Sequence, residues 1–329
     1  MKFLWQRLVY RPERLSCMQY PLVSAIVLCY NHARFVVECL ESVKAQQYPN
    51  LELIVHDDAS RDNSVAVIQA WLAKCDIPNR FLIQKTNQGL CRSLNYALSH
   101  ASGKYISGIA ADDAWLPGKL LNQVGLMERL PDKVGIVYSD ALQMDETGHL
   151  LPKKFIETHR RFKKMPEGNI HNTLWEGNFI PAMTTLVRHE CYRQAGPFDE
   201  ALFYEDWDMW LRISRSFDFV YSHEMSAKYR FVATSIVRSQ KARMLDANCQ
   251  ICVKHLDQGG LSPEARRLAL HKLFDYAITS IWKRTPGHKQ NFLKAMRIAL
   301  ADTLAFTLLW RVLSQKMVKF AFYRRTKPV

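Results

Sequence analysis

The chain has 329 residues, 48% of them apolar, and a formal net charge of +14. This length and composition exclude a disordered chain and allow one large domain with an appendage. The charge is uneven, because residues 289–329 carry nine Lys and Arg against one acidic residue, and residues 1–20 carry four against one. Basic ends suit nucleic acid, anionic lipid or solubility alike, so charge alone identifies no partner.

The eight cysteines are scattered through apolar segments. They lack the dense, even spacing of a disulfide framework, which predicts a reducing, cytoplasmic setting. Cys249 and Cys252 form a lone CxxC with His255 nearby. A structural zinc site normally needs four ligands, so we interpret both as ordinary helix residues. The N-terminus shows no secretory signal pattern.

Short apolar runs rich in β-branched residues alternate with segments of helical spacing in the first part of the chain. The runs are Leu22–Cys29, Leu51–Val55, Arg80–Gln84 and Lys104–Ile109, with Val134–Tyr138 as a further candidate. This alternation predicts an α/β fold in which helices flank a mostly parallel sheet. Ligands of such folds bind beyond the carboxyl ends of the strands.

The predicted secondary structure changes twice in the second half of the chain. The polar stretch 143–169 predicts a long loop, functional or mobile. A strand is expected at Thr184–Val187, and Glu205 and Asp206 open a helix. Beyond about Ser239 the pattern is helical to the end. We therefore expect a basic N-terminal segment (1–20), an α/β domain (21–238) and a basic helical appendage (239–329).

Two acidic pairs follow strands of the predicted sheet. Asp57 and Asp58 come after the second run, and Asp112 and Asp113 after the fourth. Adjacent carboxylates repel each other, so a divalent cation that compensates them, and that could also bind a diphosphate, would explain the pairs. The alternative is that each pair lies in a solvated turn or caps the following helix.

A third acidic group, Glu205, Asp206 and Asp208, stands at the start of a predicted helix. Asp206 and Asp208 lie about 200° apart around a helix, so only one can point into a given cleft. The alternative is again a capping role, because the helix macrodipole favours acidic residues in the first turn.

Six motifs follow one another along residues 20–237. They are Val23–Tyr30 with Asn31, VHDDASRDNS (55–64), NQGLCRSLNYAL (87–98), GKYISGIAADDAWLPGKL (103–120), GPFDEALFYEDWDMWLRIS (196–214) and YRFVATS (229–235). In this order they resemble glycosyltransferase family 2. The resemblance implies the GT-A fold, a Rossmann-like sheet between helices.

This resemblance implies a nucleoside-diphosphate sugar donor, with a UDP-sugar favoured. Tyr30 and Asp58 would hold the base, with Asp58 accepting from a uracil ring nitrogen. Asn31 and Asp57 would also belong to the nucleotide site. Arg92 is a weaker candidate for a phosphate contact.

The resemblance also implies the chemistry of the reaction. Asp112 would lie near the ribose and diphosphate, and Asp112 or Asp113 would bind Mg²⁺ or Mn²⁺. Asp206 would be the general base. One base and no enzyme nucleophile predict a single displacement that inverts the anomeric centre. The expected enzyme is thus a metal-dependent, inverting hexosyltransferase that extends saccharide or lipid-linked saccharide acceptors for cell-surface polysaccharide.

The sequence departs from the family pattern at two positions. Ala110 stands where the family often has a first Asp, and Val232 where it often has His. Both departures bear on metal or donor binding. His32, His56 and His223 are near the motifs, and we interpret each as an ordinary surface or edge histidine.

Two other classes of function are alternatives. A non-catalytic sugar-nucleotide-binding protein is the main alternative, motivated by Ala110 and Val232, but the Glu205 and Asp206 pair argues against it. No nucleic acid is expected as a partner, because no recognised binding signature occurs. The sequence predicts no oligomeric state, and it identifies neither the sugar nor the linkage.

The C-terminal segment has a helical apolar pattern. The apolar stretch Thr303–Trp310 is too short to span a bilayer. Apolar residues recur every three or four positions, at Phe306, Trp310, Leu313, Met317 and Phe320, beside the basic residues Arg311, Lys316, Lys319, Arg324 and Arg325. This pattern favours a helix on an anionic membrane surface, peripheral on the inner face of the cell membrane. The alternative is that the apolar stripe packs on the catalytic domain.

Overall fold

A seven-stranded sheet forms the centre of the molecule. The computed structural model describes residues 20–232 and 240–326, so the predicted segment 1–20 lies almost wholly outside the described residues. The strand order is β3-β2-β1-β4-β8-β6-β9. The strands are β1 (Val23–Cys29), β2 (Leu51–Asp57), β3 (Asn79–Ile83), β4 (Tyr105–Ala110), β6 (Val134–Tyr138), β8 (Leu186–Arg188) and β9 (Asp218–Tyr221). Only β8 runs antiparallel to its neighbours, so the sheet is mostly parallel, as predicted.

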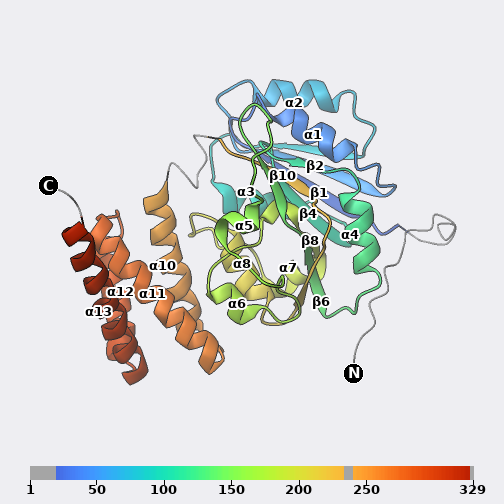
Figure 1. Cartoon of the computed structure of the whole chain (residues 1–329). Coiled ribbons are helices and arrows are strands. Elements are labelled where there is room, and N and C mark those ends of the chain that lie inside the picture. The colour runs from blue at the N-terminus through green and yellow to red at the C-terminus, as the bar shows by residue number, and fades with distance from the viewer. Residues whose placement is uncertain (1–19, 233–239, 327–329) are drawn as a thin grey trace.

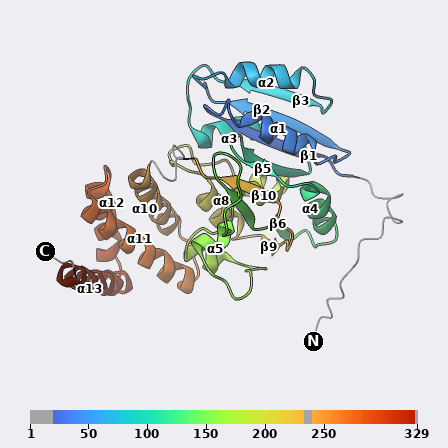
Figure 2. The ribbon, with the colours of Figure 1, turned by 45° about the horizontal axis from the view of Figure 1, so that its top comes forward.

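Helices cover both faces of this sheet (Figure 1). These helices are α1 (Val36–Lys44), α2 (Ser64–Leu72) and α4 (Lys119–Met127) on one face, and α3 (Leu90–Leu98) and α7 (His189–Ala195) on the other. Figure 2 shows α1 and α2 on one side of β1 and β2, with α3 on the other. Side chains alternate along a strand. Ala25 and Val27 of β1 therefore pack with α1, whereas Ile26 packs with α3.

A second, three-stranded sheet adjoins the first. It has the order β5-β10-β7 and consists of β5 (Ala114–Trp115), β10 (Ala227–Arg230) and β7 (Ala141–Met144). The predicted loop 143–169 begins within β7 and contains the short helix α5 (Phe155–His159). Three further helices lie between β7 and β9. They are α6 (His171–Trp175), the 3-10 helix η2 (Ala182–Thr184) and α8 (Asp206–Ile213).

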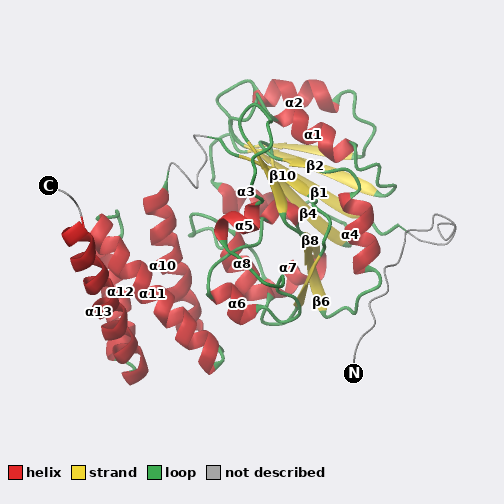
Figure 3. Cartoon of the chain, viewed as in Figure 1, coloured by secondary structure: helices red, strands yellow, loops and turns green. Residues whose placement is uncertain are grey.

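Four helices form a bundle beside the sheet (Figure 3). They are α10 (Lys241–Gln258), α11 (Pro263–Lys283), α12 (His288–Leu300) and α13 (Thr303–Thr326). Local sequence explains where α11 begins: the Ser262 hydroxyl accepts a hydrogen bond from the backbone N–H of Ala265, and Pro263 occupies the first turn. Both features favour a helix start. The predicted C-terminal helices are thus present.

The bundle shares its hydrophobic core with the α/β part. Trp175 of α6 and Trp207 of α8 belong to one buried cluster with Cys252 of α10 and with Leu273 and Phe274 of α11. The predicted boundary near residue 238 therefore divides the chain into elements of different kind, but it does not divide this core.

Helix α13 presents apolar side chains on two sides. Ala305, Leu308, Leu309 and Val312 are buried in the core cluster that the bundle forms. Phe306 and Trp310 are 43% and 59% exposed. The side chains of Met317, Phe320, Lys319, Arg324 and Arg325 lie outside the described part of the structure. Among the described helices, none is long and apolar enough to cross a membrane.

Candidate active site

A cleft of about 1050 Å³ opens at the carboxyl ends of the parallel strands. One wall consists of residues that follow β1, β2 and β4, together with the start of α3. The other wall consists of residues 200–203, the first half of α10, and residues 286–294 at the start of α12. Its volume lies at the upper end of the range for small-molecule sites.

The two carboxylates after β2 have different roles. Asp58 lines the cleft, and its two oxygens accept hydrogen bonds from the backbone N–H groups of Gln88 (2.7 Å) and Gly89 (2.8 Å). Asp57 is fully buried and accepts from the backbone and hydroxyl of Ser60, at 2.8 and 2.6 Å. Asp58 is therefore available to a ligand, whereas Asp57 holds the turn. Asp57 is neither solvated nor a cap of α2, whose N-cap residue is Asn63.

Tyr30 and Asn31, after β1, both line the cleft. Tyr30 is 39% exposed, so its ring offers a face to a ligand. Asn31 has a left-handed backbone, with φ of 59°. Asn tolerates this conformation better than most residues do. The Asn31 side chain accepts a hydrogen bond from the N–H of Arg61 at 2.7 Å, which fixes the neighbouring turn.

The two carboxylates after β4 also differ in their environments and roles. Asp112 lines the cleft, and its Oδ2 lies 3.7 Å from Nε2 of His32. Asp113 is buried, is not part of the cleft lining, and accepts a hydrogen bond from the backbone N–H of Arg230 at 2.8 Å. Burial, and then the charge of Asp112, raise the pKa of Asp113 well above its usual value. Asp113 thus holds β10, and Asp112 is the carboxylate presented to the cleft.

The donor set around Asp112 suits a magnesium-like ion that binds together with a phosphate. Within residues 20–232 and 240–326, no three His, Cys, Asp or Glu side chains gather as a preformed metal cage. Mg²⁺ commonly uses only one or two carboxylates, with waters and substrate phosphates as its other ligands. Nδ1 of His32 is buried without a hydrogen-bond partner among the described residues, so it could orient a water or ligand beside Asp112.

Arg92 of α3 lines the cleft but its charge is already paired. Its Nε lies 2.9 Å from Oε2 of Glu200, and its Nη1 donates to Gln88 at 3.1 Å. A phosphate would therefore compete with Glu200 for this guanidinium.

His56 is a cleft residue that sequence reasoning undervalued. The sequence predicts a surface or edge histidine here, but the His56 side chain is fully buried, near the end of β2. Neither ring nitrogen has a partner among the described residues. Burial lowers the pKa of His56, which favours the neutral ring. The available signal was a polar residue directly after the apolar run Leu51–Val55.

The three acidic residues at the start of α8 lie in different environments. Asp208 is buried and pairs with Arg212 (2.9 Å), Lys254 (2.9 Å) and His255 (3.0 Å), and these hydrogen bonds and charges hold its pKa below the usual range despite burial. Asp208 is therefore structural. His255 contacts Asp208, and the two cysteines of the CxxC, Cys249 and Cys252, are buried free thiols.

Asp206 and Glu205 remain as the titratable pair, although neither is part of the cleft lining. Asp206 accepts hydrogen bonds from Asn178 Nδ2 (2.8 Å) and from the backbone N–H of Trp207 (2.6 Å). Burial raises the pKa of Asp206 to about 6. Burial and the neighbouring Asp206 charge raise the pKa of Glu205 to about 8. Asp206 therefore has the lower pKa of the pair and loses its proton first.

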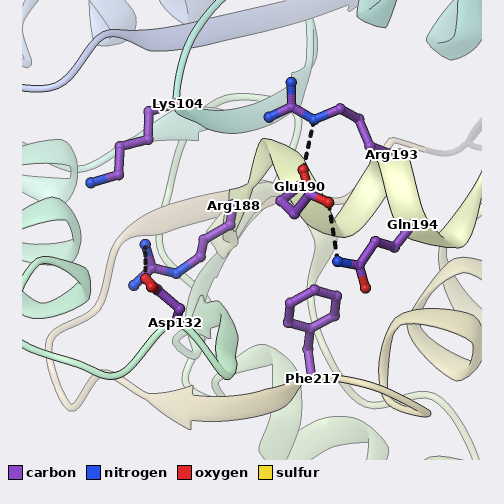
Figure 4. A pocket seen from close by; sticks show the side chains of 7 residues that line it. All are labelled: Lys104, Asp132, Arg188, Glu190, Arg193, Gln194 and Phe217. Atoms are coloured by element: carbon purple, nitrogen blue, oxygen red, sulfur yellow. Dashed lines mark hydrogen bonds and ion pairs between the residues drawn. The ribbon is translucent and has the colours of Figure 1, made fainter.

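A smaller cavity, of about 330 Å³, lies at the opposite edge of the sheet (Figure 4). Its lining residues Lys104 and Arg188 stand at the start of β4 and the end of the antiparallel β8. Its charged groups are compensated: Arg188 Nη1 lies 3.6 Å from Asp132, and Arg193 Nε lies 2.9 Å from Glu190. This cavity offers no free charge to a ligand.

Known sequences resemble part of this chain, and the family profile matches the part that forms one wall of the cleft. The profile of the family described as "Glycosyl transferase family 2" matches residues 24–193. An uncharacterized glycosyltransferase of Rickettsia typhi is 30% identical over 211 residues, which cover 64% of each chain. The putative glycosyltransferase EpsE of Bacillus subtilis is 32% identical over 195 residues, covering 58% of this chain and 66% of the relative. The chain thus spans less than two thirds of the length of either relative.

Solved structures with the same fold are more distant in sequence. The mannosyltransferase PcManGT from Pyrobaculum calidifontis, in complex with GDP-Man and Mn²⁺, has a TM-score of 0.62 at 20% identity, over 91% of this chain and 81% of that one. A fragment of S. aureus TarS in complex with UDP-GlcNAc has a TM-score of 0.60 at 16% identity, over 92% of both chains. The family match covers half of the chain and the fold agrees, so the chain belongs to glycosyltransferase family 2 and has the GT-A fold.

Proposed function

We propose that the protein transfers a sugar from a UDP-sugar to a saccharide or lipid-linked saccharide acceptor in cell-surface polysaccharide synthesis, with inversion at the anomeric centre. The observation that carries this proposal is the cleft, which brings Asp58 and Asp112 to one wall beyond the strand ends. Structures that resemble the chain were solved with GDP-Man and Mn²⁺ and with UDP-GlcNAc, which supports a nucleotide-sugar donor.

Tyr30 and Asp58 would bind the base of the donor. The backbone N–H groups of Gln88 and Gly89 fix the Asp58 carboxylate, and each oxygen keeps a lone pair for a ring N–H of the base. The exposed Tyr30 ring offers a stacking surface on the same wall. Asn31 and Asp57 would act indirectly, because their hydrogen bonds keep the turns at this wall in place.

Asp112 would hold a Mg²⁺ or Mn²⁺ ion, with Asp113 behind it as a weaker candidate ligand. When bound, such an ion neutralises the charge that develops on the departing diphosphate. Ala110 lines the cleft and contributes no carboxylate, and Val232 lines it where a His would add a donor. Asp112 and His32 are then the polar groups on which this side of the site depends.

Asp206 would take the proton of the acceptor hydroxyl as that oxygen attacks the sugar. A general base works best when its pKa lies near the working pH, and a pKa of about 6 meets this condition. Asn178 orients the carboxylate. Asp208 cannot serve, because the cationic side chains of Arg212 and Lys254 and the ring of His255 already surround it.

The bundle supplies a surface for a membrane-borne acceptor. Phe306 and Trp310 are exposed apolar side chains on α13, and the neighbouring Arg311 is exposed and basic. Of the basic residues expected to face lipid, Lys316 instead pairs with Asp275 of α11 at 2.7 Å. An exposed aromatic pair beside positive charge suits the inner face of an anionic membrane.

Nucleotide binding and turnover test this proposal together. Calorimetry with UDP, GDP, dTDP and CMP would compare affinities in Mn²⁺ and in chelator, and we expect UDP with Mn²⁺ to bind tightest. Hydrolysis of a panel of UDP-sugars would then identify the sugar. Binding without any turnover, unchanged in Asp206→Asn, would favour the non-catalytic sugar-nucleotide-binding protein. Failure of every nucleotide to bind would refute the function itself.

A further inference from the structure

We propose that the bundle wall of the cleft is a second anion site, in which Arg243 of α10 and Lys294 of α12 bind a phosphate group of the acceptor. This inference rests on the proposed transferase function. The two cations line the same cleft as Asp58 and Asp112, on the opposite wall.

The bundle wall is polar and basic. Beside Arg243 and Lys294 it presents the amide side chains of Gln250 and Gln290, and all four side chains are exposed. Cationic groups with amide hydrogen-bond donors beside them suit phosphate oxygens.

No carboxylate neutralises the two cations among the described residues. The Arg243 guanidinium lies 4.1 Å from the centre of the Phe203 ring and donates to Gln240 at 2.8 Å. The ring and the amide hold the guanidinium in place, and no described carboxylate forms an ion pair with it. Glu200, the cleft carboxylate near this wall, is paired with Arg92.

The remaining acid of this wall, Asp246, is occupied. Its carboxylate accepts hydrogen bonds from Thr285 Oγ1 (2.6 Å), Asn291 Nδ2 (2.7 Å) and the backbone N–H of Gly287 (2.9 Å). A Cβ at Gly287 would lie 3.0 Å from the Asp246 carboxyl carbon, so glycine permits this close approach. These bonds fasten α10 to the turn before α12, so the two cations stand on a preorganised wall.

The ligand of this wall is distinct from the donor. The donor's diphosphate would lie at Asp112 on the far wall, through the bound metal ion. Lys294 is followed along α12 by the exposed apolar residue Leu300 and preceded by Leu293, which are 71% and 68% exposed. A phosphate with an apolar tail would thus find charge inside the cleft and apolar surface outside it. The shared chemistry is a phosphate ester, either on a lipid carrier or on a free saccharide.

Calorimetry on full-length protein would test the site, with and without saturating UDP and Mg²⁺. The probes are geranyl phosphate, inorganic phosphate and geraniol. We expect geranyl phosphate to bind in the presence of UDP, and Arg243→Gln and Lys294→Gln each to weaken it about tenfold, the usual effect of losing one charge-assisted hydrogen bond. Arg243→Lys should retain most of the affinity. Lys289→Gln, on the same helix but outside the cleft lining, is the matched control.

The arms of this experiment separate the sources of the phosphate. Tighter binding of geranyl phosphate than of inorganic phosphate assigns the site to a lipid-linked acceptor, and equal binding of the two assigns it to a free phosphorylated saccharide. If Arg243→Gln and Lys294→Gln leave geraniol binding unchanged, the two cations interact with the phosphate and not with the apolar tail. Equal affinities of wild type and both variants, or displacement of geranyl phosphate by UDP, would overturn the proposal. If the protein binds geranyl phosphate but not UDP, the result would instead count against the proposed donor site.

Discussion

Nε2 of His255 lies 3.0 Å from Oδ1 of Asp208, and both side chains are almost wholly buried. This contact joins α10 to α8, the helix that begins with Asp206. Lys254 and Arg212 share the same carboxylate. The bundle and the proposed catalytic helix are therefore held together by one buried charged group as well as by a common hydrophobic core.

We expect Asp208→Ala to destabilise the whole fold by about 3–5 kcal/mol, because it leaves the largely buried Arg212 guanidinium without its carboxylate. Urea unfolding at pH 7 would measure the loss. Asp257→Ala is the matched control, since Asp257 pairs with Arg297 at the surface and such pairs contribute about 1 kcal/mol or less. Equal stability of the two variants would contradict the structural role of Asp208.

The pH dependence of stability should follow from the same group. The folded-state pKa of Asp208 is lowered, so its contribution is present above the unfolded value of about 3.9 and is lost as pH falls below it. The wild type should therefore lose more stability between pH 5 and pH 3 than Asp208→Ala does. Parallel curves for the two proteins would refute this.

The sequence predicted the parallel half of the sheet because each apolar run ends in polar residues that share one edge. It could not distinguish Asp57 from Asp58, since the direction of each side chain depends on contacts with Ser60 and Gln88, which only the folded chain supplies. The sequence predicted a strand at Thr184–Val187, but the antiparallel pairing of β8 and the shared core depend on partners distant in sequence. Long-range contacts of this kind leave no local pattern.

Asp206→Asn should fold, bind UDP normally and lose most transfer activity, by about 10²–10⁴-fold, because an amide cannot accept the proton. In the wild type, kcat/KM should fall as pH drops below about 6, where Asp206 becomes protonated. Glu205→Gln is the matched control. Because Glu205 has the higher pKa of the pair and is not the proposed base, this change should retain activity. Near-normal turnover in Asp206→Asn would exclude it as the base.

The two carboxylates after β4 should respond differently to substitution. Asp112→Ala should weaken Mn²⁺-dependent binding of UDP and leave stability nearly unchanged, since Asp112 faces the cleft. Asp113→Ala should instead lower the free energy of unfolding by about 1–3 kcal/mol, because the buried N–H of Arg230 loses its acceptor. Calorimetry and urea unfolding of both variants would check this. A loss of metal-dependent binding confined to Asp113→Ala would reverse the assignment.

His56→Val should move stability and affinity in opposite directions. Valine removes two ring nitrogens that have no partner among the described residues, which contributes a gain of about 1–3 kcal/mol. The lost ring volume and the lost contact with Tyr96 offset part of this gain, so we expect a small net stabilisation. If the ring contacts the base beside Asp58, affinity for UDP should fall at the same time. Thermal unfolding and calorimetry would measure the two quantities. A gain in stability with unchanged affinity would show that His56 does not contact the nucleotide.

Membrane docking can be tested without disturbing the packing of α13. Truncation before α13 would expose the core face formed by Ala305, Leu309 and Val312, so loss of vesicle binding would be ambiguous. Substitutions of the exposed face avoid this difficulty. Phe306→Ser with Trp310→Ser removes two aromatic side chains that the fold leaves exposed, and neither belongs to the core cluster.

Sedimentation with anionic vesicles at low salt should show wild-type protein bound and the double variant at least tenfold weaker. Burial of a large apolar side chain contributes about 1.5–3 kcal/mol, and 1.4 kcal/mol corresponds to tenfold. Leu150→Ser is the matched control, because Leu150 is 57% exposed on the α/β part and lies far along the chain from the bundle. Raising the salt concentration should weaken wild-type binding, since each basic residue at the surface adds about 1 kcal/mol. If the double variant binds as the wild type does, the exposed face of α13 does not meet the membrane, and its aromatic side chains must serve another partner.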